Sequence, residues 1–143
     1  EEIADAIGYE GAFYISLSPE GYPAFSGGGC LSARDLARFG LIFTRQGRNI
    51  AGQPFANNEF LSKTISRDAP QLSEPKGWLR YSNHLMTDGR FVGHAGYGGQ
   101  FLLIDTKRKT SISFLSVLEN EDGYDDAYMG KVAVTLKNVL QQF

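Results

Sequence analysis

The sequence has little of several features that mark particular classes of protein. It has a single cysteine, Cys30, which cannot form an internal disulfide, and we interpret it as a small buried hydrophobe. No apolar run reaches the roughly 18 residues that a membrane-spanning helix needs. The chain starts with Glu1-Glu2 and no basic-then-apolar leader. We therefore expect neither a membrane span nor a signal peptide within it.

An excess of charge of one sign is also missing. The 14 Lys and Arg residues nearly balance the 16 Asp and Glu residues, which leaves a net charge of −2 at pH 7. This balance gives no electrostatic reason to expect nucleic acid or an anionic membrane as a partner. The hydrophobic content of 42% is ordinary, and the length is typical of one domain. We therefore predict a single domain over residues 1–143.

Two internal helices are predicted from their capping residues. Ser32, with Asp35 three residues later in a near capping box, begins a helix expected to run to about Gln46 and to stop at Gly47. A shorter helix is expected near residues 57–63, capped by Asn57 or Asn58. Four arginines mark the first helix and its end. They fit a solvated face better than a surface for a polyanion, because acidic residues balance the domain: Arg34, Arg38, Arg45 and Arg48.

Helical patterns are also present at both ends of the chain. Residues 1–14 carry a weak helical pattern, and residues 16–29 are expected to form a loop because they are rich in glycine and proline. Residues 124–142 are predicted to form a closing helix. The residues expected on its inner face are Ala127, Val132, Leu136, Val139 and Leu140.

Aromatic and β-branched runs between turn residues predict the strands. Residues 78–86 are predicted to form one strand, which residues 87–90 connect by a hairpin turn to a strand that begins at Phe91. Two more strands are expected at residues 100–105 and 110–118. The predicted fold class is therefore α+β, with an antiparallel sheet of about three to five strands, helices packed on it and a closing C-terminal helix.

Two segments carry a resemblance to a known family. Residues 26–40, SGGGCLSARDLARFG, resemble the glycine run, cap and "DLARFG" helix of the serine β-lactamase and D,D-peptidase superfamily, particularly its esterase and 6-aminohexanoate-dimer hydrolase branch. Residues 91–105, FVGHAGYGGQFLLID, resemble its "GH-x-G…GG" strand pair, which ends in an aspartate before a turn. The resemblance extends from about Ile7 onward and implies part of a β-lactamase/transpeptidase-like fold.

The resemblance implies roles for three residues. In this family the serine of Ser-x-x-Lys attacks a carbonyl, a Tyr-x-Asn or Ser-x-Asn element lies nearby, and a Lys-Thr-Gly or His-x-Gly strand faces the serine. His94-Ala95-Gly96 matches the third element. His94 would orient the substrate or the general base, Gly96 would let the substrate lie against the strand, and the N–H of Tyr97 would be an oxyanion donor. The alternative for His94 is an ordinary histidine at a strand end.

The sequence also contains short matches to the other two elements. The residues Ser73-Glu74-Pro75-Lys76 match Ser-x-x-Lys, but Pro75 and its polar surroundings predict a loop, whereas the chemistry needs a helix N-terminus. The residues Tyr81-Ser82-Asn83 match Tyr-x-Asn but lie on a predicted strand, only a few residues further on. We interpret both as chance matches and expect the nucleophile to lie before Glu1.

Three hypotheses for function follow. The first is part of a serine hydrolase for a small-molecule amide or ester, which on its own has little acyl-transfer activity. The second is a stand-alone binding or assembly domain, in which a homodimer or a second chain covers the exposed sheet. The third, a residual esterase that uses Ser73, has less support.

Other constellations do not indicate a cofactor or a metal. His84, His94 and Asp88 lack metal-ligand spacing, and the acidic residues between 119 and 126 do not match a calcium loop. Residues 96–99, GYGG, do not match G-x-G-x-x-G and do not open a helix. We therefore expect no cofactor.

Overall fold

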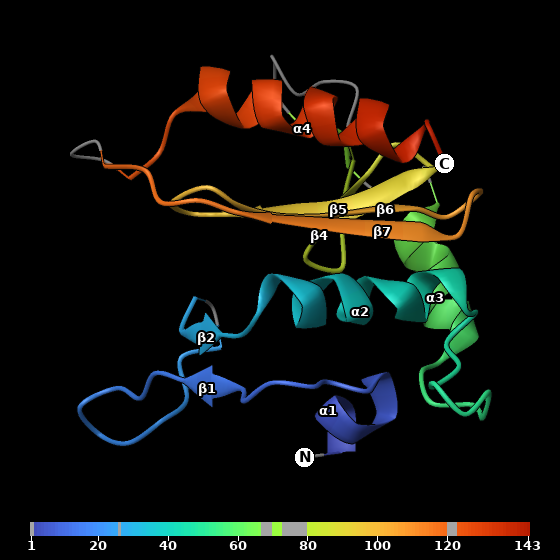
Figure 1. Ribbon diagram of the computed structural model, residues 1–143, viewed down its shortest axis with the longest axis horizontal. Coiled ribbons are helices and arrows are strands. Elements are labelled where there is room, and N and C mark those ends of the chain that lie inside the picture. Colours follow the sequence, from blue (N-terminus) through green and yellow to red (C-terminus); the bar gives the residue numbers. More distant parts are fainter. Residues whose placement is uncertain (1, 26, 67–69, 73–79, 120–122) are drawn as a thin grey trace.

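The computed structural model describes residues 2–25, 27–66, 70–72, 80–119 and 123–143 (Figure 1). A five-stranded sheet lies at the centre. Helix α4 (Asp126–Leu140) covers one face, and α2 (Ala33–Thr44) covers the other. The short helix α1 (Glu2–Ile7) lies beyond α2, on the side away from the sheet. The α+β prediction, with a closing C-terminal helix, is confirmed.

The sheet is an antiparallel meander. Its strands are β3 (Arg80–Ser82), β4 (Leu85–Thr87), β5 (Phe91–Gly96), β6 (Gln100–Asp105) and β7 (Thr110–Leu115), and their order in the sheet is the order in the chain. The strand predicted at residues 100–105 is confirmed, and so is the turn that follows it. The strand predicted to reach residue 118 ends at Leu115.

The single strand predicted over residues 78–86 is wrong. The chain reverses at Asn83 and His84, which have φ of 49° and 63°, so the segment forms the hairpin β3–β4. Asn83 tolerates the left-handed region better than most residues, and its amide Nδ2 donates to Thr64 Oγ1 at 2.8 Å. Trp78 lies outside the described residues.

The predicted turn at residues 87–90 is confirmed. The carboxylate of Asp88 accepts hydrogen bonds from the backbone N–H groups of Arg90 at 3.0 Å and Phe91 at 2.8 Å. Gly89 takes φ of 91°, a conformation that favours glycine. This turn fixes the start of β5.

Capping residues set the beginnings of two helices as predicted. The Ser32 hydroxyl accepts from the N–H of Asp35, and Asn57 accepts from Phe60 N–H at the start of α3 (Asn58–Ile65). Helix α2 ends at Thr44, two residues earlier than predicted. Two consecutive residues with positive φ, Gln46 and Gly47, then turn the chain away.

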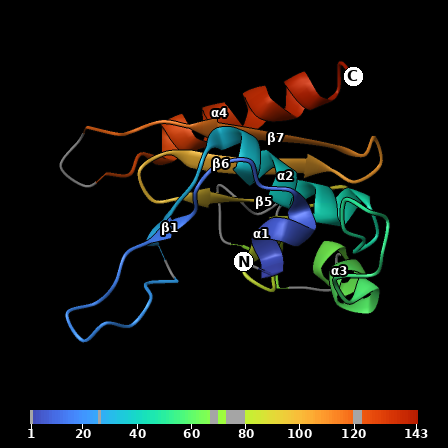
Figure 2. The same cartoon turned by 60° about the horizontal axis from the view of Figure 1, so that its bottom comes forward.

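The N-terminal segment differs from its prediction. The helix expected over residues 1–14 ends at Ile7, and Tyr14–Ile15 forms β1, which pairs with β2 (Gly29–Cys30). The loop between them extends away from the sheet (Figure 2). Cys30 is exposed on this ribbon, so its prediction as a buried hydrophobe is wrong. The paired residues are 16 and 14 positions apart in the sequence (Tyr14–Cys30 and Ile15–Gly29), so the pairing has little local sequence signal.

The core lies on both faces of the sheet. Val92 and Ile104 have no exposed surface and pack beneath α2, whereas Phe101 packs with Met129 and Leu136 of α4. The inner face of α4 was predicted in part: Leu136 and Leu140 are buried, and Val132 and Val139 are half-buried. Ala127 was expected to face inward and is exposed instead, while the buried Met129 was missed.

Buried Asp35 ties the N-terminal segment to α2. Its carboxylate accepts from the backbone N–H groups of Glu10 at 3.0 Å and Gly11 at 3.1 Å, and from Ser32 Oγ and Arg38 Nη1. The hydrogen bond from the Glu10 N–H, supported by the other donors, outweighs burial and lowers the pKa of Asp35 from 3.8 to about 2. The near capping box is therefore only half formed, because Asp35 binds this segment rather than the Ser32 N–H.

Strand β7 forms one edge of the sheet. Within the described residues it pairs with β6 alone, and Phe114 and Leu115 remain 38% and 43% exposed. Thr110–Leu115 carries no charge and no proline, which are the residues that usually protect an edge. No helix within the described ranges is long and apolar enough to cross a membrane.

Candidate active-site strand

Strand β5 carries the candidate site residues, and it forms more residue pairs with β6 on one side than with β4 on the other. It pairs with β6 at six positions, from Phe91 opposite Asp105 to Gly96 opposite Gln100. Its registered pairs with β4 are only Val92–Thr87 and Gly93–Met86. In the described part of the chain, the last three residues of β5 therefore have no registered strand partner on the β4 side. They are His94, Ala95 and Gly96.

His94 is the first residue of β5 after its registered pairs with β4, and it is exposed. Because side chains alternate along a strand, His94 lies on the same face as Val92, which packs against Leu36 and Phe39 of α2. The rings of Tyr81 and His94 form an edge-to-face pair with centroids 6.1 Å apart, and the centroid of the His84 ring lies 6.5 Å from that of Tyr81. His94 is thus both accessible and flanked by an aromatic ring.

The structure gives different positions to the members of the Tyr-x-Asn match. Tyr81 contacts His94, but Ser82 Oγ donates to Lys63 O at 3.4 Å and Asn83 is bonded to Thr64. The polar groups of Ser82 and Asn83 therefore attach the hairpin to α3. The sequence alone does not predict that Tyr81 lies beside His94, since only the β3–β4 hairpin brings it next to β5. The Ser73–Lys76 match lies outside the described residues.

Two glycines of β5 differ in how strictly they are required. A Cβ on Gly93 would lie 2.0 Å from the carbonyl oxygen of Leu102, so the neighbouring backbone excludes any side chain. A Cβ on Gly96 would lie 2.8 Å from Oε1 of Gln100, the end of a flexible side chain. Gly93, the first glycine of the GH-x-G match, had no predicted role and is the stricter requirement for the strand.

Tyr97 follows β5 and projects outward. Its side chain is 73% exposed and stacks on Tyr124 with centroids 5.8 Å apart and planes inclined by 17°. Gly98 and Gly99 take φ of 93° and 95°, and they turn the chain into β6. The phenol packs on the loop before α4, so any part that Tyr97 plays at the strand depends on its backbone N–H.

A small apolar hollow lies beside β5. It measures about 70 Å³ and is lined on its inner side by Gly93, Ala95, Leu103 and Leu136. Cavities that enclose small-molecule ligands are usually about 300–1,000 Å³. This hollow is therefore too small to enclose a ligand of that kind.

Asp105, the aspartate that ends the second resembling segment, lies at the other end of the β5–β6 pair from His94. It is buried and accepts from Arg90 and from the N–H groups of Lys107 and Arg108, at 3.0 and 3.1 Å. Burial alone would raise the pKa of Asp105, but the hydrogen bonds from Arg90 and these amides outweigh it and lower the pKa. Asp105 thus fixes the β6–β7 turn.

The antiparallel meander, its closing helix and the strand β5, with its histidine between two glycines, agree with the serine β-lactamase/transpeptidase-like class of fold. The family model described as Beta-lactamase matches residues 2–135. The chain belongs to the Beta-lactamase family, and the resemblance stated from its motifs is confirmed. No curated protein matches the chain.

Proposed function

We propose that this chain supplies the His-x-Gly wall of a serine hydrolase active site for acyl transfer on an amide or ester. In this proposal His94 orients the substrate or the general base, Gly96 keeps the strand surface open, and the Tyr97 N–H helps to hold the oxyanion. The attacking serine of Ser-x-x-Lys belongs to a part of the full domain that precedes Glu1. The chain from 1 to 143 is then a single but incomplete domain.

One observation carries the proposal: the exposed His94 lies where the β4–β5 ladder has stopped. An extended substrate can add to a strand at such a place through backbone hydrogen bonds. Membership of the Beta-lactamase family makes a serine hydrolase the favoured class.

Covalent labelling tests whether the nucleophile is absent. The 143-residue chain is incubated with a fluorophosphonate and, separately, with a chromogenic ester, and its intact mass and turnover are measured. We expect neither an adduct nor turnover above that of His94→Ala. An adduct that Ser73→Ala abolishes and Ser18→Ala retains would instead establish the Ser73 esterase.

The second candidate is an assembly domain without catalysis. A second copy pairing along the unprotected β7 edge, where Phe114 and Leu115 are partly exposed, would support it, whereas an edge that stays open fits an incomplete domain. Sedimentation distinguishes the two: a dimer that Leu115→Lys dissociates supports assembly through β7, whereas a monomer supports the hydrolase part.

A further inference from the structure

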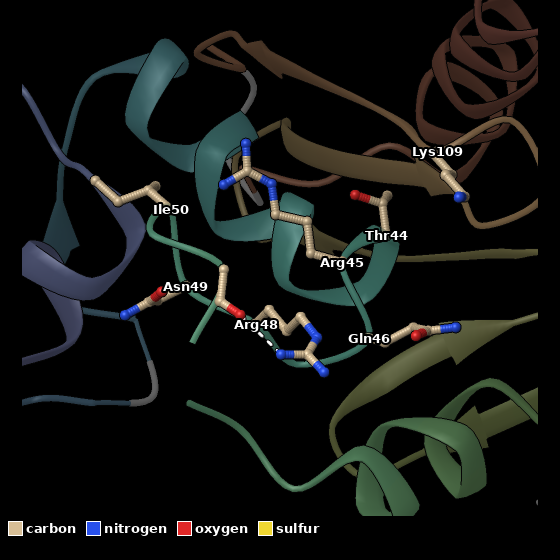
Figure 3. A pocket seen from close by; sticks show the side chains of 8 residues that line it. Thr44, Arg45, Gln46, Arg48, Asn49, Ile50 and Lys109 are labelled. Atoms are coloured by element: carbon tan, nitrogen blue, oxygen red, sulfur yellow. Dashed lines mark hydrogen bonds between the residues drawn. The ribbon is translucent and has the colours of Figure 1, made fainter. Parts of the chain in front are cut away.

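A second hollow, of about 400 Å³, opens at the other end of the sheet from His94 (Figure 3). Its lining comes from two segments far apart in the sequence, residues 44–52 after α2 and Lys109 in the β6–β7 turn. Three of the lining residues are cationic: Arg45, Arg48 and Lys109. No acidic residue of the described chain lines it.

The segment after α2 is held in shape by its own hydrogen bonds. Phe55 and Ala56 both donate their N–H groups to the carbonyl oxygen of Gly47, at 2.9 and 2.8 Å. Asn49 closes the tip, because its N–H donates to Gln53 O and its Oδ1 accepts from Gln53 N–H. This wall therefore exists before any ligand arrives, which lowers the entropic cost of binding.

Further contacts hold the side chain of Arg48 and the turn that carries Lys109. Arg48 Nη1 donates to Gly52 O at 2.7 Å, which keeps its guanidinium at the mouth of the hollow (Figure 3). The turn that carries Lys109 is anchored by Asp105, which accepts from the Lys107 and Arg108 N–H groups. Both walls are thus built on hydrogen-bonded turns.

The positive charge of this site is not neutralised within the described residues. There, the side chains of Arg45 and Lys109 form no hydrogen bond or ion pair, and both are exposed. The buried carboxylate nearest in sequence to Lys109, Asp105, is paired with Arg90. Two cations at the site are therefore available to an anion.

A simpler account covers only part of this arrangement. Cations after a helix C-terminus are stabilised by the helix dipole, and this explains Arg45 and Arg48. It does not explain why Lys109 comes to the same hollow from a turn sixty residues later, or why no carboxylate accompanies the three cations.

We propose that this hollow binds a small phosphorylated molecule, whose phosphoryl oxygens are held by Arg45, Arg48 and Lys109. One guanidinium group can donate hydrogen bonds to two phosphate oxygens at once, and the lysine ammonium adds a compact positive charge. The volume suits a molecule of metabolite size rather than a lone ion. The site would be separate from the candidate active-site strand and does not depend on its function.

Calorimetric titration with pyrophosphate tests the site. The 143-residue chain and two double variants are compared at one physiological ionic strength, with sulfate as the control anion. Arg45→Gln/Lys109→Gln removes two charges from the hollow. Lys63→Gln/Lys131→Gln removes two exposed charges from α3 and α4. We expect saturable binding that the first pair weakens at least about tenfold and the second leaves within about twofold, because only the first removes ligand contacts.

Three outcomes would overturn the proposal: no saturable binding, equal weakening in the two double variants, or equal binding of sulfate and pyrophosphate. A sugar phosphate, titrated in parallel, separates the sources of the phosphoryl group. Binding as tight as that of pyrophosphate supports a phosphate monoester, and much weaker binding supports a diphosphate. Melting temperatures of both double variants close to that of the original chain ensure that the loss is one of binding.

Discussion

The rings of Tyr81 and His94 form an edge-to-face pair, with centroids 6.1 Å apart and ring planes inclined by 69°. An edge-to-face pair of this kind restricts rotation of the imidazole. Tyr81 belongs to the β3–β4 hairpin, whose strand β4 pairs with β5 only as far as Gly93. The contact thus connects the orientation of the proposed site residue to the β3–β4 hairpin.

Replacing Tyr81 tests this connection. Tyr81→Leu should shift the proton resonances of the His94 ring, because the ring current of the neighbouring phenol is lost, and should cost about 0.5–1 kcal/mol of stability. Tyr81→Phe should retain the resonance positions. Tyr22→Leu, at an exposed ring on the β1–β2 ribbon, is the control and should leave the His94 resonances unchanged. Identical His94 spectra in the chain and in Tyr81→Leu would contradict the contact.

Gly93 of β5 and Gly27 of the β1–β2 loop make a matched pair. Gly93→Ala should destabilise the fold by about 3 kcal/mol or more, since its Cβ would lie 2.0 Å from a backbone oxygen that cannot move independently. Gly27→Ala, where a Cβ meets nothing within 4 Å, should stay within about 0.5 kcal/mol. Urea denaturation measures both. A Gly93→Ala chain as stable as Gly27→Ala would mean that β5 and β6 are not paired in this register.

Two helical glycines should respond in opposite directions to the same substitution. Gly130→Ala should stabilise the chain by up to about 1 kcal/mol, because α4 is open at that point and alanine favours the helix. Gly40→Ala should destabilise it, because a Cβ would lie 2.2 Å from Ser111 Oγ and 2.8 Å from Ile104. Thermal unfolding of the two variants checks the packing of α2 against the sheet, and a stabilising Gly40→Ala would contradict it.

Removing the Ser111 hydroxyl should restore part of the stability that Gly40→Ala loses. Its buried hydroxyl has no hydrogen-bond partner within the described chain, so Ser111→Ala should be neutral or stabilising by about 1 kcal/mol. The double variant Gly40→Ala/Ser111→Ala should be more stable than Gly40→Ala alone. A loss of stability in Ser111→Ala would show that the hydroxyl has a partner after all.

Acid should reveal the contribution of Asp35. The pKa of Asp35 is lowered from 3.8 to about 2, so its stabilising effect is complete above pH 3.8 and is lost as the pH falls toward 2. Asp35→Asn should be clearly less stable than the original chain at neutral pH, and this difference should shrink between pH 4 and pH 2. Glu20→Gln, at an exposed loop carboxylate, should show no comparable loss at neutral pH. A difference between the original chain and Asp35→Asn that does not vary with pH would contradict the buried network.

Local chemistry accounts for what could be predicted from the sequence. The caps Ser32 and Asn57, and the turn at Asp88-Gly89, act within a few residues of themselves, and the structure has all three as expected. The turn at Asn83-His84 was missed, because it lacks a glycine and is stabilised by Thr64 of a different element. The β1–β2 ribbon was missed for the related reason that its pairing is distant in sequence.

The candidate site could be predicted only in part, because some of its contacts join residues that are distant in the sequence. The motif around His94 could be found from residue types alone, but its neighbour Tyr81 was discounted because the segment read as one continuous strand. The basic hollow combines residues 45–48 with Lys109, and no spacing rule connects them. The sequence predicts a solvated face for the four arginines, and Arg34 fits this prediction, since it pairs with Glu10 at the surface.

The most direct test of the central claim is a nitrogen-15 NMR titration of the chain with a small N-acyl amide that cannot be hydrolysed. The account predicts that the amide resonances that shift are those of residues 94–99 and Tyr81, with β7 unaffected, and that His94→Ala weakens the effect while Lys131→Gln does not. Shifts confined to another surface, or an unchanged titration in His94→Ala, would contradict the claim that the free side of β5 faces the substrate.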